Sequence, residues 1–313
     1  QAAGRAALMT PTIIAEIGGN HRGEINTARR MVDIVGRYCT EHFGLHDRST
    51  SVAPRAYVKF QKRTCDLDTY PAWTKPHPNP QNAYGDTYLK HRRALEFDIE
   101  QHRLLMEWAS DCGSGYGCSV WDVNAAREIA SLGPDWIKVP SASNLDLDLL
   151  SVLVDEFGGD IHISLGMTRR SEVYQLVDFL RSAGGLHRVV LYACTSDYPA
   201  SADNTKLGEL EWISSAFGAE LAGVGFSGHH AGIAIDMGAT ALGAQYIERH
   251  FTLDRTWKGT DHAASLEPDG LRKLMRDVRA VSAALGKKPD TGLLDCEYEQ
   301  REKLKSSLGA SAP

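Results

Sequence analysis

Long apolar runs are missing from this chain of 313 residues. A transmembrane helix needs about 20 consecutive apolar residues, and no run approaches that length. Residues 1–9 also lack the apolar core of a signal peptide. We therefore expect a soluble cytoplasmic protein that does not bind a membrane.

Cysteine pairs and basic runs are absent as well. The six cysteines are scattered, with no Cys-x-x-Cys pair and no framework spacing, so we expect reduced thiols rather than a disulfide framework. Cys118 and Cys194 lie within apolar runs, where we expect packing thiols. The formal net charge is −6, without a long basic stretch, which argues against nucleic-acid binding. An anionic ligand would need positive charge concentrated in its own site.

The chain does contain a regular alternation of short apolar runs and amphipathic segments. Its composition, 42% hydrophobic and 24% charged, is typical of a globular protein with a large core. The short runs predict eight strands, at residues 11–17, 56–61, 115–119, 136–139, 161–165, 189–195, 223–227 and 246–250. Each is followed by helical periodicity, at residues 25–35, 98–110, 124–132, 147–156, 170–183, 207–217, 233–243 and 268–285.

Eight strand-helix units predict an α/β fold, a closed (β/α)8 TIM barrel rather than an open sheet, because closure leaves no exposed edge. We assign residues 1–10 to an N-terminal extension, 11–286 to the barrel and 287–313 to a charged C-terminal tail. Residues 44–54 interrupt the first connection. Residues 66–82, rich in proline and aromatic residues, predict a long loop over the barrel mouth. Barrel enzymes carry their chemistry at the carboxyl ends of the strands, so polar residues there are the candidates.

Two predicted strands lead directly to a histidine. His229 follows the seventh strand, and His250 ends the eighth, Tyr246-Ile-Glu-Arg-His. If these strands are parallel neighbours about 4.8 Å apart, both imidazoles could bind one divalent cation. Glu248 shares a face with His250, so its carboxylate could ligate the ion or orient a bound water. Alternatively, each histidine only forms hydrogen bonds in the core or at the rim.

Charged residues mark the ends of other strands. Glu16 ends the first strand and could act as a general base or hold a substrate hydroxyl, or it could pair with a lysine for stability alone. Lys59 and Gln61 share one face of the second strand, and Lys138 lies in the fourth. Burying two lysines costs free energy unless an anion neutralises their charge, so we predict a phosphate or carboxylate ligand.

Hydroxyl groups surround the predicted lysine pair. Five serines lie at or just after the ends of strands three to seven, at Ser119, Ser141, Ser164, Ser196 and Ser227. Such a ring of donors suits a small phosphorylated acid better than an apolar ligand. Tyr198 and Asp261 could reach inward from loops to bind hydroxyls, or could be a loop-packing tyrosine and a turn aspartate.

Six ordered motifs between about residue 12 and residue 286 carry a resemblance to a known family. They are Ile13-Ile-Ala-Glu-Ile-Gly-Gly-Asn-His, Val58-Lys-Phe-Gln-Lys, Cys194-Thr-Ser-Asp-Tyr-Pro, Ser227-Gly-His, Glu248-Arg-His and Lys258-Gly-Thr-Asp-His-Ala-Ala-Ser-Leu-Glu-Pro. On these motifs the chain resembles the N-acetylneuraminate (sialic acid) synthase family. That family condenses phosphoenolpyruvate with the open-chain aldehyde of a sugar such as N-acetylmannosamine, giving a nine-carbon 2-keto acid and phosphate.

The resemblance implies roles for the candidate residues. It implies a metal, Mn²⁺ or Mg²⁺, held by His229 and His250. It implies phosphoenolpyruvate bound by Lys59, Lys138, Ser119, Ser141, Ser164, Ser196 and Ser227. It places Glu16, Gln61, Tyr198, Asp261 and Asn82 toward the sugar, with Glu16 managing protons. We therefore expect a metal-dependent carbon–carbon bond-forming transferase; the alternatives are a metal-dependent pyruvate aldolase and a catalytically silent phosphoenolpyruvate-binding or scaffolding subunit.

The chain also departs from the family's pattern. Ser143 replaces an acidic residue that is common after the fourth strand, and Leu165 stands where a small hydroxyl residue is usual. Family members usually carry a small C-terminal antifreeze-like domain, which covers the partner's barrel in a swapped dimer and supplies an arginine to the sugar. Residues 287–313 leave no room for it, so we expect that a separate capping protein replaces it or that the substrate does not need that arginine. The resemblance implies a homodimer, although without that domain the usual reason for one is missing.

Overall fold

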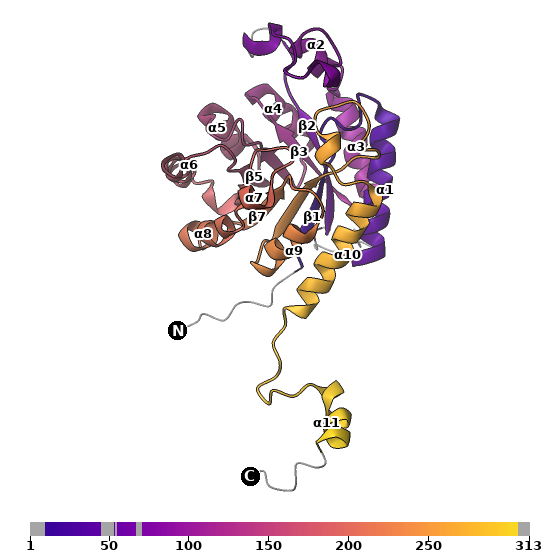
Figure 1. Ribbon diagram of the computed structural model, residues 1–313. Coiled ribbons are helices and arrows are strands. Elements are labelled where there is room, and N and C mark those ends of the chain that lie inside the picture. The colour runs from indigo at the N-terminus through magenta and orange to yellow at the C-terminus, as the bar shows by residue number, and fades with distance from the viewer. Residues whose placement is uncertain (1–9, 45–52, 54, 67–70, 306–313) are drawn as a thin grey trace.

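Eight parallel strands close into a barrel in the computed structural model, which describes residues 10–44, 53, 55–66 and 71–305 (Figure 1). The strands are β1 (Thr12–Glu16), β2 (Ala56–Lys62), β3 (Gly115–Val120), β4 (Trp136–Val139), β5 (Asp160–Ser164), β6 (Val189–Cys194), β7 (Gly223–Gly228) and β8 (Tyr246–His250). Their order along the chain is their order in the sheet, and β8 pairs with β1 to close it. The predicted (β/α)8 barrel is confirmed.

Helices cover the outside of the barrel (Figure 1). The main ones are α1 (Ile25–Phe43), α3 (Ile99–Asp111), α4 (Val123–Leu132), α5 (Leu147–Glu156), α6 (Arg170–Ser182), α8 (Gly208–Phe217), α9 (Ala234–Ala241) and α10 (Pro268–Ala284). Short elements lie in the loops, namely η3 (Leu186–Arg188), α7 (Ala202–Thr205) and η4 (His262–Ala264). The first helix continues past its predicted end at residue 35, because Tyr38, Cys39 and His42 extend its buried face.

The large apolar core lies between the strand layer and the helix layer. A smaller cluster, Ile14, Tyr57, Trp136, Val190 and Tyr192, fills the barrel interior toward the amino ends of the strands. Trp136 packs over Gly117, where an added Cβ would lie 2.1 Å from the indole ring. Since strand residues alternate between faces, the next inward positions, such as Lys59 and Lys138, lie above this aromatic cluster and toward the carboxyl ends.

The excursion between β2 and α3 differs from the predicted loop. It contains η1 (Pro71–Thr74), η2 (Pro80–Asn82) and α2 (Tyr88–Arg93), which lies above β2 in Figure 1. These helices are too short to leave a periodic signal in the sequence. Most of the interruption predicted at residues 44–54, together with residues 1–9 and 67–70, lies outside the described residues.

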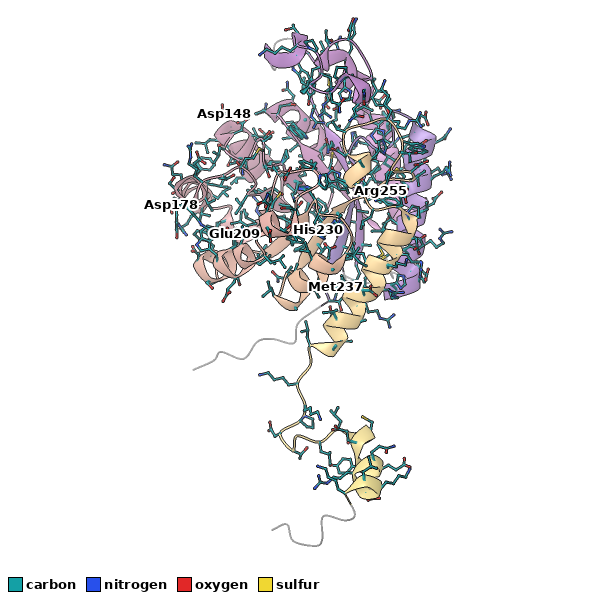
Figure 2. The ribbon with its side chains drawn as sticks, in the orientation of Figure 1. Asp148, Asp178, Glu209, His230, Met237 and Arg255 are labelled. Atoms are coloured by element: carbon teal, nitrogen blue, oxygen red, sulfur yellow. The ribbon has the colours of Figure 1, made fainter. Side chains whose placement is uncertain are left out.

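The chain after α10 leaves the barrel. It contains η5 (Asp295–Glu297) and α11 (Tyr298–Leu304), and α11 lies apart from the barrel in Figure 1. Charged side chains such as Asp148 and Asp178 lie on the outer helices, whereas His230 is buried near the centre of the molecule (Figure 2). In the described part of the chain, every helix is too short or too polar to cross a membrane.

Candidate active site

A cavity of about 390 Å³ lies at the carboxyl ends of the strands. All the candidate residues from the sequence except Asn82 line this cavity. They are Glu16, Lys59, Gln61, Ser119, Lys138, Ser141, Ser164, Ser196, Tyr198, Ser227, His229, His250 and Asp261. Asn82 lies at the end of η2, outside the lining of the cavity. The barrel thus brings together residues that are separated by more than two hundred positions in the chain.

Two lysines and two carboxylates form a buried cluster at the floor of the cavity. Nζ of Lys59 lies 2.8 Å from Oε2 of Glu16 and 3.5 Å from Oε1 of Glu248. Nζ of Lys138 lies 3.1 Å from Oε2 of Glu248 and 3.3 Å from the centre of the Tyr192 ring. The four formal charges cancel. The protein's own carboxylates therefore balance these lysines, so burial of the lysines does not by itself require a ligand, and the phosphate or carboxylate ligand stays a prediction.

Burial and attraction together set the pKa values in this cluster. Burial would raise the pKa of Glu248, but Lys138 and Lys59 hold it well below its usual range. Burial works against the charge of Lys59, yet Glu16 and Glu248 keep its pKa raised. Burial lowers the pKa of Lys138 to about 8. Attraction to Glu248 raises this pKa, whereas repulsion from Lys59 lowers it further. Lys138 is therefore a cation that titrates just above neutral pH.

The imidazoles of His229 and His250 lie side by side, with ring centroids 5.4 Å apart. Nδ1 of His229 lies 2.7 Å from the carbonyl oxygen of Thr195. Because a carbonyl oxygen only accepts, Nδ1 carries the proton and Nε2 keeps its lone pair. Burial, with a contribution from His250, lowers the pKa of His229 to about 4, so this ring is neutral at pH 7. A neutral imidazole is the form that binds metal ions.

The two imidazoles could bind a divalent cation whose remaining ligands are not protein side chains. Nδ1 of His250 is buried and has no hydrogen-bond partner among the described residues. Glu248 binds two lysines and accepts a hydrogen bond of 3.2 Å from Ser227, so it is a counter-charge rather than a third ligand. No cluster of three or more His, Cys, Asp or Glu in the described residues is arranged to hold a metal. Water or substrate oxygens would complete the coordination of an ion at this pair.

The predicted ring of serines is present around the cavity. Oγ of Ser119 accepts a hydrogen bond of 2.6 Å from Lys59, and Oγ of Ser141 accepts one of 3.0 Å from the backbone N–H of Gly166. A Cβ at Gly166 would lie 2.3 Å from Oγ of Ser196 and 2.7 Å from Oγ of Ser141. Glycine at this position therefore allows two hydroxyls from different strand ends to converge.

A chain of hydrogen bonds leads from the floor of the cavity toward its mouth. Nε2 of Gln61 donates to Oε1 of Glu16 at 2.7 Å, and Nη2 of Arg63 donates to Oε1 of Gln61 at 2.8 Å. Lys59, Gln61 and Arg63 therefore line one wall, as alternate positions along the strand direction.

Sequence analysis missed several residues that line this cavity, among them Arg63, Arg92, Trp121 and Thr260. The alternation that placed Lys59 and Gln61 together would also have placed Arg63. Arg92 comes from α2, whose path above the barrel no sequence pattern predicts. Cys118 is buried as predicted, whereas Cys194 lines the cavity, and burial raises the pKa of its thiol.

Fold and cavity together define a (β/α)8-barrel enzyme whose polar site lies at the carboxyl ends of the strands. The chain belongs to the NeuB family, whose model matches residues 51–290. The family predicted from the motifs is confirmed, and so is the prediction of a sialic acid synthase-like enzyme.

The relatives agree with this assignment. N-acetylneuraminate-9-phosphate synthase of Mus musculus is 35% identical over 302 residues, which cover 95% of this chain and 77% of that protein. N,N'-diacetyllegionaminic acid synthase of Campylobacter jejuni is 30% identical over 276 residues, covering 88% and 77% respectively. The crystal structure of N-acetylneuraminic acid (sialic acid) synthetase from Leptospira borgpetersenii in complex with citrate is similar with a TM-score of 0.75 and 25% identity, covering 95% of this chain and 93% of that one.

Proposed function

We propose that this chain condenses phosphoenolpyruvate with the open-chain aldehyde of an N-acetylmannosamine-like sugar, giving a 2-keto-3-deoxy sugar acid of the nonulosonic type and phosphate. The observation that carries the proposal is the convergence, in one cavity, of the Lys59–Lys138 cluster with the facing imidazoles of His229 and His250. The names of the relatives, synthases of N-acetylneuraminate 9-phosphate and of diacetyllegionaminic acid, support this class of product.

Phosphoenolpyruvate would bind over the lysine cluster. Its phosphate and carboxylate need several donors, and the cavity offers two ammonium groups and the serine ring. Since Glu16 and Glu248 already balance the lysines, the incoming anion would share the lysines with them. The hydroxyls of Ser141 and Ser196, which meet above Gly166, add donors that carry no countercharge. The substrate would thus be held by a rigid set of groups before reaction.

The sugar aldehyde would lie against the imidazole pair. A Mn²⁺ or Mg²⁺ ion held there by His229 and His250 would act as a Lewis acid on the aldehyde oxygen. The protein's contribution is to hold the two rings side by side and to keep His229 neutral. The carbonyl oxygen of Thr195 selects the tautomer of His229, and the Tyr198 ring packs 4.1 Å from it, centroid to centroid.

Glu16 would manage the protons of the reaction. Attack of the enol carbon on the aldehyde leaves positive charge at the phosphate-bearing carbon, to which water adds before phosphate leaves. Glu16 lies at the end of β1, 2% exposed, with Lys59 and Gln61 fixing its two oxygens. A carboxylate held in this way can accept the proton of the adding water.

A phosphate-release assay tests the proposal. The chain is incubated with phosphoenolpyruvate, Mn²⁺ and a panel of aldoses, and phosphate and 2-keto acid are both measured. We expect the two products in equal amounts, and only when an acceptor is present. Condensation of pyruvate without phosphate release would instead indicate a metal-dependent aldolase. Tight phosphoenolpyruvate binding without product across the panel would indicate a binding or scaffolding subunit.

A further inference from the structure

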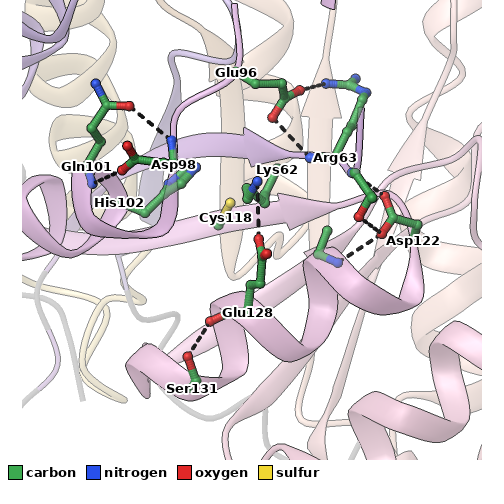
Figure 3. Close-up of polar contacts among 12 residues, drawn as sticks. Lys62, Arg63, Glu96, Asp98, Gln101, His102, Cys118, Asp122, Glu128 and Ser131 are labelled. Carbon is green, nitrogen blue, oxygen red and sulfur yellow. Dashed lines mark hydrogen bonds and ion pairs between the residues drawn. The ribbon is translucent and has the colours of Figure 1, made fainter. Parts of the chain in front are cut away.

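Two arginines lie at the outer end of the cavity, away from the lysine cluster. Arg63 follows the end of β2 and is buried, and Arg92 comes from α2 above it. Figure 3 shows the Arg63 guanidinium directed toward Glu96, with Nη1 3.5 Å from Oε1, and the Arg63 backbone N–H donating to Oε2 at 3.1 Å. The guanidinium carbon Cζ lies 3.7 Å from the centre of the Trp121 ring. Glu96 is thus the carboxylate that balances Arg63.

Arg92 adds a positive charge that the described residues do not balance. Its Nε and Nη2 donate to the phenol oxygen of Tyr88 at 3.0 and 2.6 Å, and it forms no ion pair with a carboxylate of the described residues. Burial, followed by repulsion from Arg92, lowers the pKa of Arg63 to about 10. Glu96 pairs with Arg63, and Arg92 has no carboxylate partner among the described residues, so this wall of the cavity carries a guanidinium that can bind an anion.

From their position, these arginines would contact the acceptor sugar rather than phosphoenolpyruvate. Lys59, Gln61 and Arg63 occupy successive inward positions, so Arg63 lies roughly 13 Å along the strand direction from Lys59, at about 3.3 Å per residue. Gln61 links the Arg63 guanidinium to Glu16, the residue proposed to lie between the substrates. The arginines are therefore at the far end of the wall that the sugar would occupy.

We propose that Arg63 and Arg92 bind a terminal phosphate on the acceptor sugar, so that this chain uses a phosphorylated aldose. The inference rests on the proposed function. Among the relatives, the Mus musculus enzyme is named for a 9-phosphate product and the Campylobacter jejuni enzyme is not, so the names alone do not decide. Since phosphoenolpyruvate contributes three carbons, a phosphate on carbon nine of the product comes from carbon six of the acceptor, the end remote from the aldehyde. Guanidinium groups suit a phosphomonoester because their planar N–H donors match its oxygens.

Steady-state kinetics with N-acetylmannosamine and its 6-phosphate test the inference. We expect wild-type kcat/KM to be higher for the 6-phosphate by about tenfold or more. Arg92→Gln is expected to lower kcat/KM for the 6-phosphate by about ten- to hundredfold, the usual loss for hydrogen bonds to a charged group. The loss for the unphosphorylated sugar, and the change in KM for phosphoenolpyruvate, are expected to be much smaller.

Arg93→Gln is the matched control. Arg93 is the next residue of α2, is exposed, and donates to the carbonyl oxygen of Cys65 at 3.0 Å without lining the cavity. Its substitution is expected to leave the preference unchanged. A second variant, Arg63→Lys, keeps the charge but loses the planar donors, and is expected to reduce the preference while leaving the thermal unfolding midpoint close to that of the wild type.

The possible outcomes separate the two proposals. Turnover of the unphosphorylated sugar without a preference for the 6-phosphate would overturn the inference and leave the proposed function standing. An equal loss for both sugars, or a rise in KM for phosphoenolpyruvate alone, in Arg92→Gln would also overturn it. Failure to release phosphate with either of these sugars would overturn the inference, and failure with every aldose of the panel would overturn the proposed function as well.

Discussion

Single side chains in the cavity are held in defined chemical states by their neighbours. The Thr195 carbonyl selects the tautomer of His229, and Gln61 and Lys59 fix the two oxygens of Glu16. Glu248 is an anion because two lysines bind it. Each of these states results from one or two contacts, so substitutions of single residues should have specific effects.

Removing either imidazole should remove the proposed metal. We expect His229→Ala and His250→Ala to lower bound Mn²⁺ to a small fraction of the wild-type value and to abolish phosphate release, because among the described residues these two imidazoles are the proposed protein ligands. Metal content after gel filtration is measured by atomic absorption. His187→Ala, at an exposed histidine, is the control. Full metal content in both variants would refute the assignment of these ligands.

The charge of Lys138 should control phosphoenolpyruvate binding as pH rises. Its pKa in the folded protein is about 8, below that of a free lysine, so the ammonium is lost as pH rises through this value. We expect phosphoenolpyruvate affinity to fall between about pH 7 and 9, with little change in sugar affinity. In Lys138→Gln the inflection near pH 8 should disappear, and affinity should be about ten- to hundredfold weaker than that of the wild type at pH 7 but close to it once the wild-type lysine is neutral. An unchanged pH profile in this variant would contradict the role of Lys138.

Strands β7 and β8 present the two histidines because a buried polar network ties them to α9. Arg249, between Glu248 and His250 in β8, forms an ion pair with Asp236 of α9 and donates to the carbonyl oxygens of His230 and Gly232 at 2.6 and 2.8 Å. Nε2 of His230 lies 3.2 Å from Oδ2 of the same aspartate. The turn after β7, which carries His229, is thereby fixed to the outside of β8.

Breaking this network should cost stability. We expect Asp236→Ala to lower the free energy of unfolding by about 3–5 kcal/mol, because it leaves the guanidinium of Arg249 buried without its countercharge. Urea denaturation followed by circular dichroism measures the loss. Asp269→Ala removes two surface ion pairs on α10, with Arg272 and Lys273, and should have a much smaller effect. Equal losses in the two variants would show that burial of the pair does not matter.

Closure of the barrel depends on how its interior is filled. The aromatic side chains of Tyr57, Trp136 and Tyr192 occupy the lower half because glycines face them, and this filling leaves the upper half to the charged cluster. The cavity is therefore bounded below by aromatic rings and above by the loops that follow the strands. Its shape belongs to the barrel as a unit rather than to any one strand-helix pair.

A side chain added at Gly117 should disturb the whole barrel. An alanine Cβ there would lie 2.1 Å from the Trp136 ring, so we expect Gly117→Ala to lower the free energy of unfolding by about 1–3 kcal/mol. Gly158→Ala is the control, since a Cβ at Gly158 meets nothing within 4 Å. Thermal and urea unfolding of both variants are compared with the wild type. If Gly117→Ala were as stable as the control, the aromatic side chains of the barrel interior would have to rearrange at little cost in free energy.

The alternation of apolar runs and amphipathic segments was enough to predict the closed barrel, with each strand within one residue of its observed ends. It also predicted which polar side chains line one cavity, because strand ends of a closed parallel barrel meet at one mouth. Lys59, His229 and His250 were found in this way. The short helices between β2 and α3 were not predicted, because segments of a few residues show no periodicity.

The alternation of apolar and polar residues along the sequence indicates which face of a strand is buried. This information was enough to predict the fold class and most of the residues that line the cavity. It does not report which charges meet across the barrel. The pairing of Glu248 with two lysines and the meeting of Arg63 with Arg92 were decided only by tertiary structure, because they join strands and helices far apart in sequence. Electrostatic energy depends on distance and burial in space, and the chain acquires both only when β8 pairs with β1.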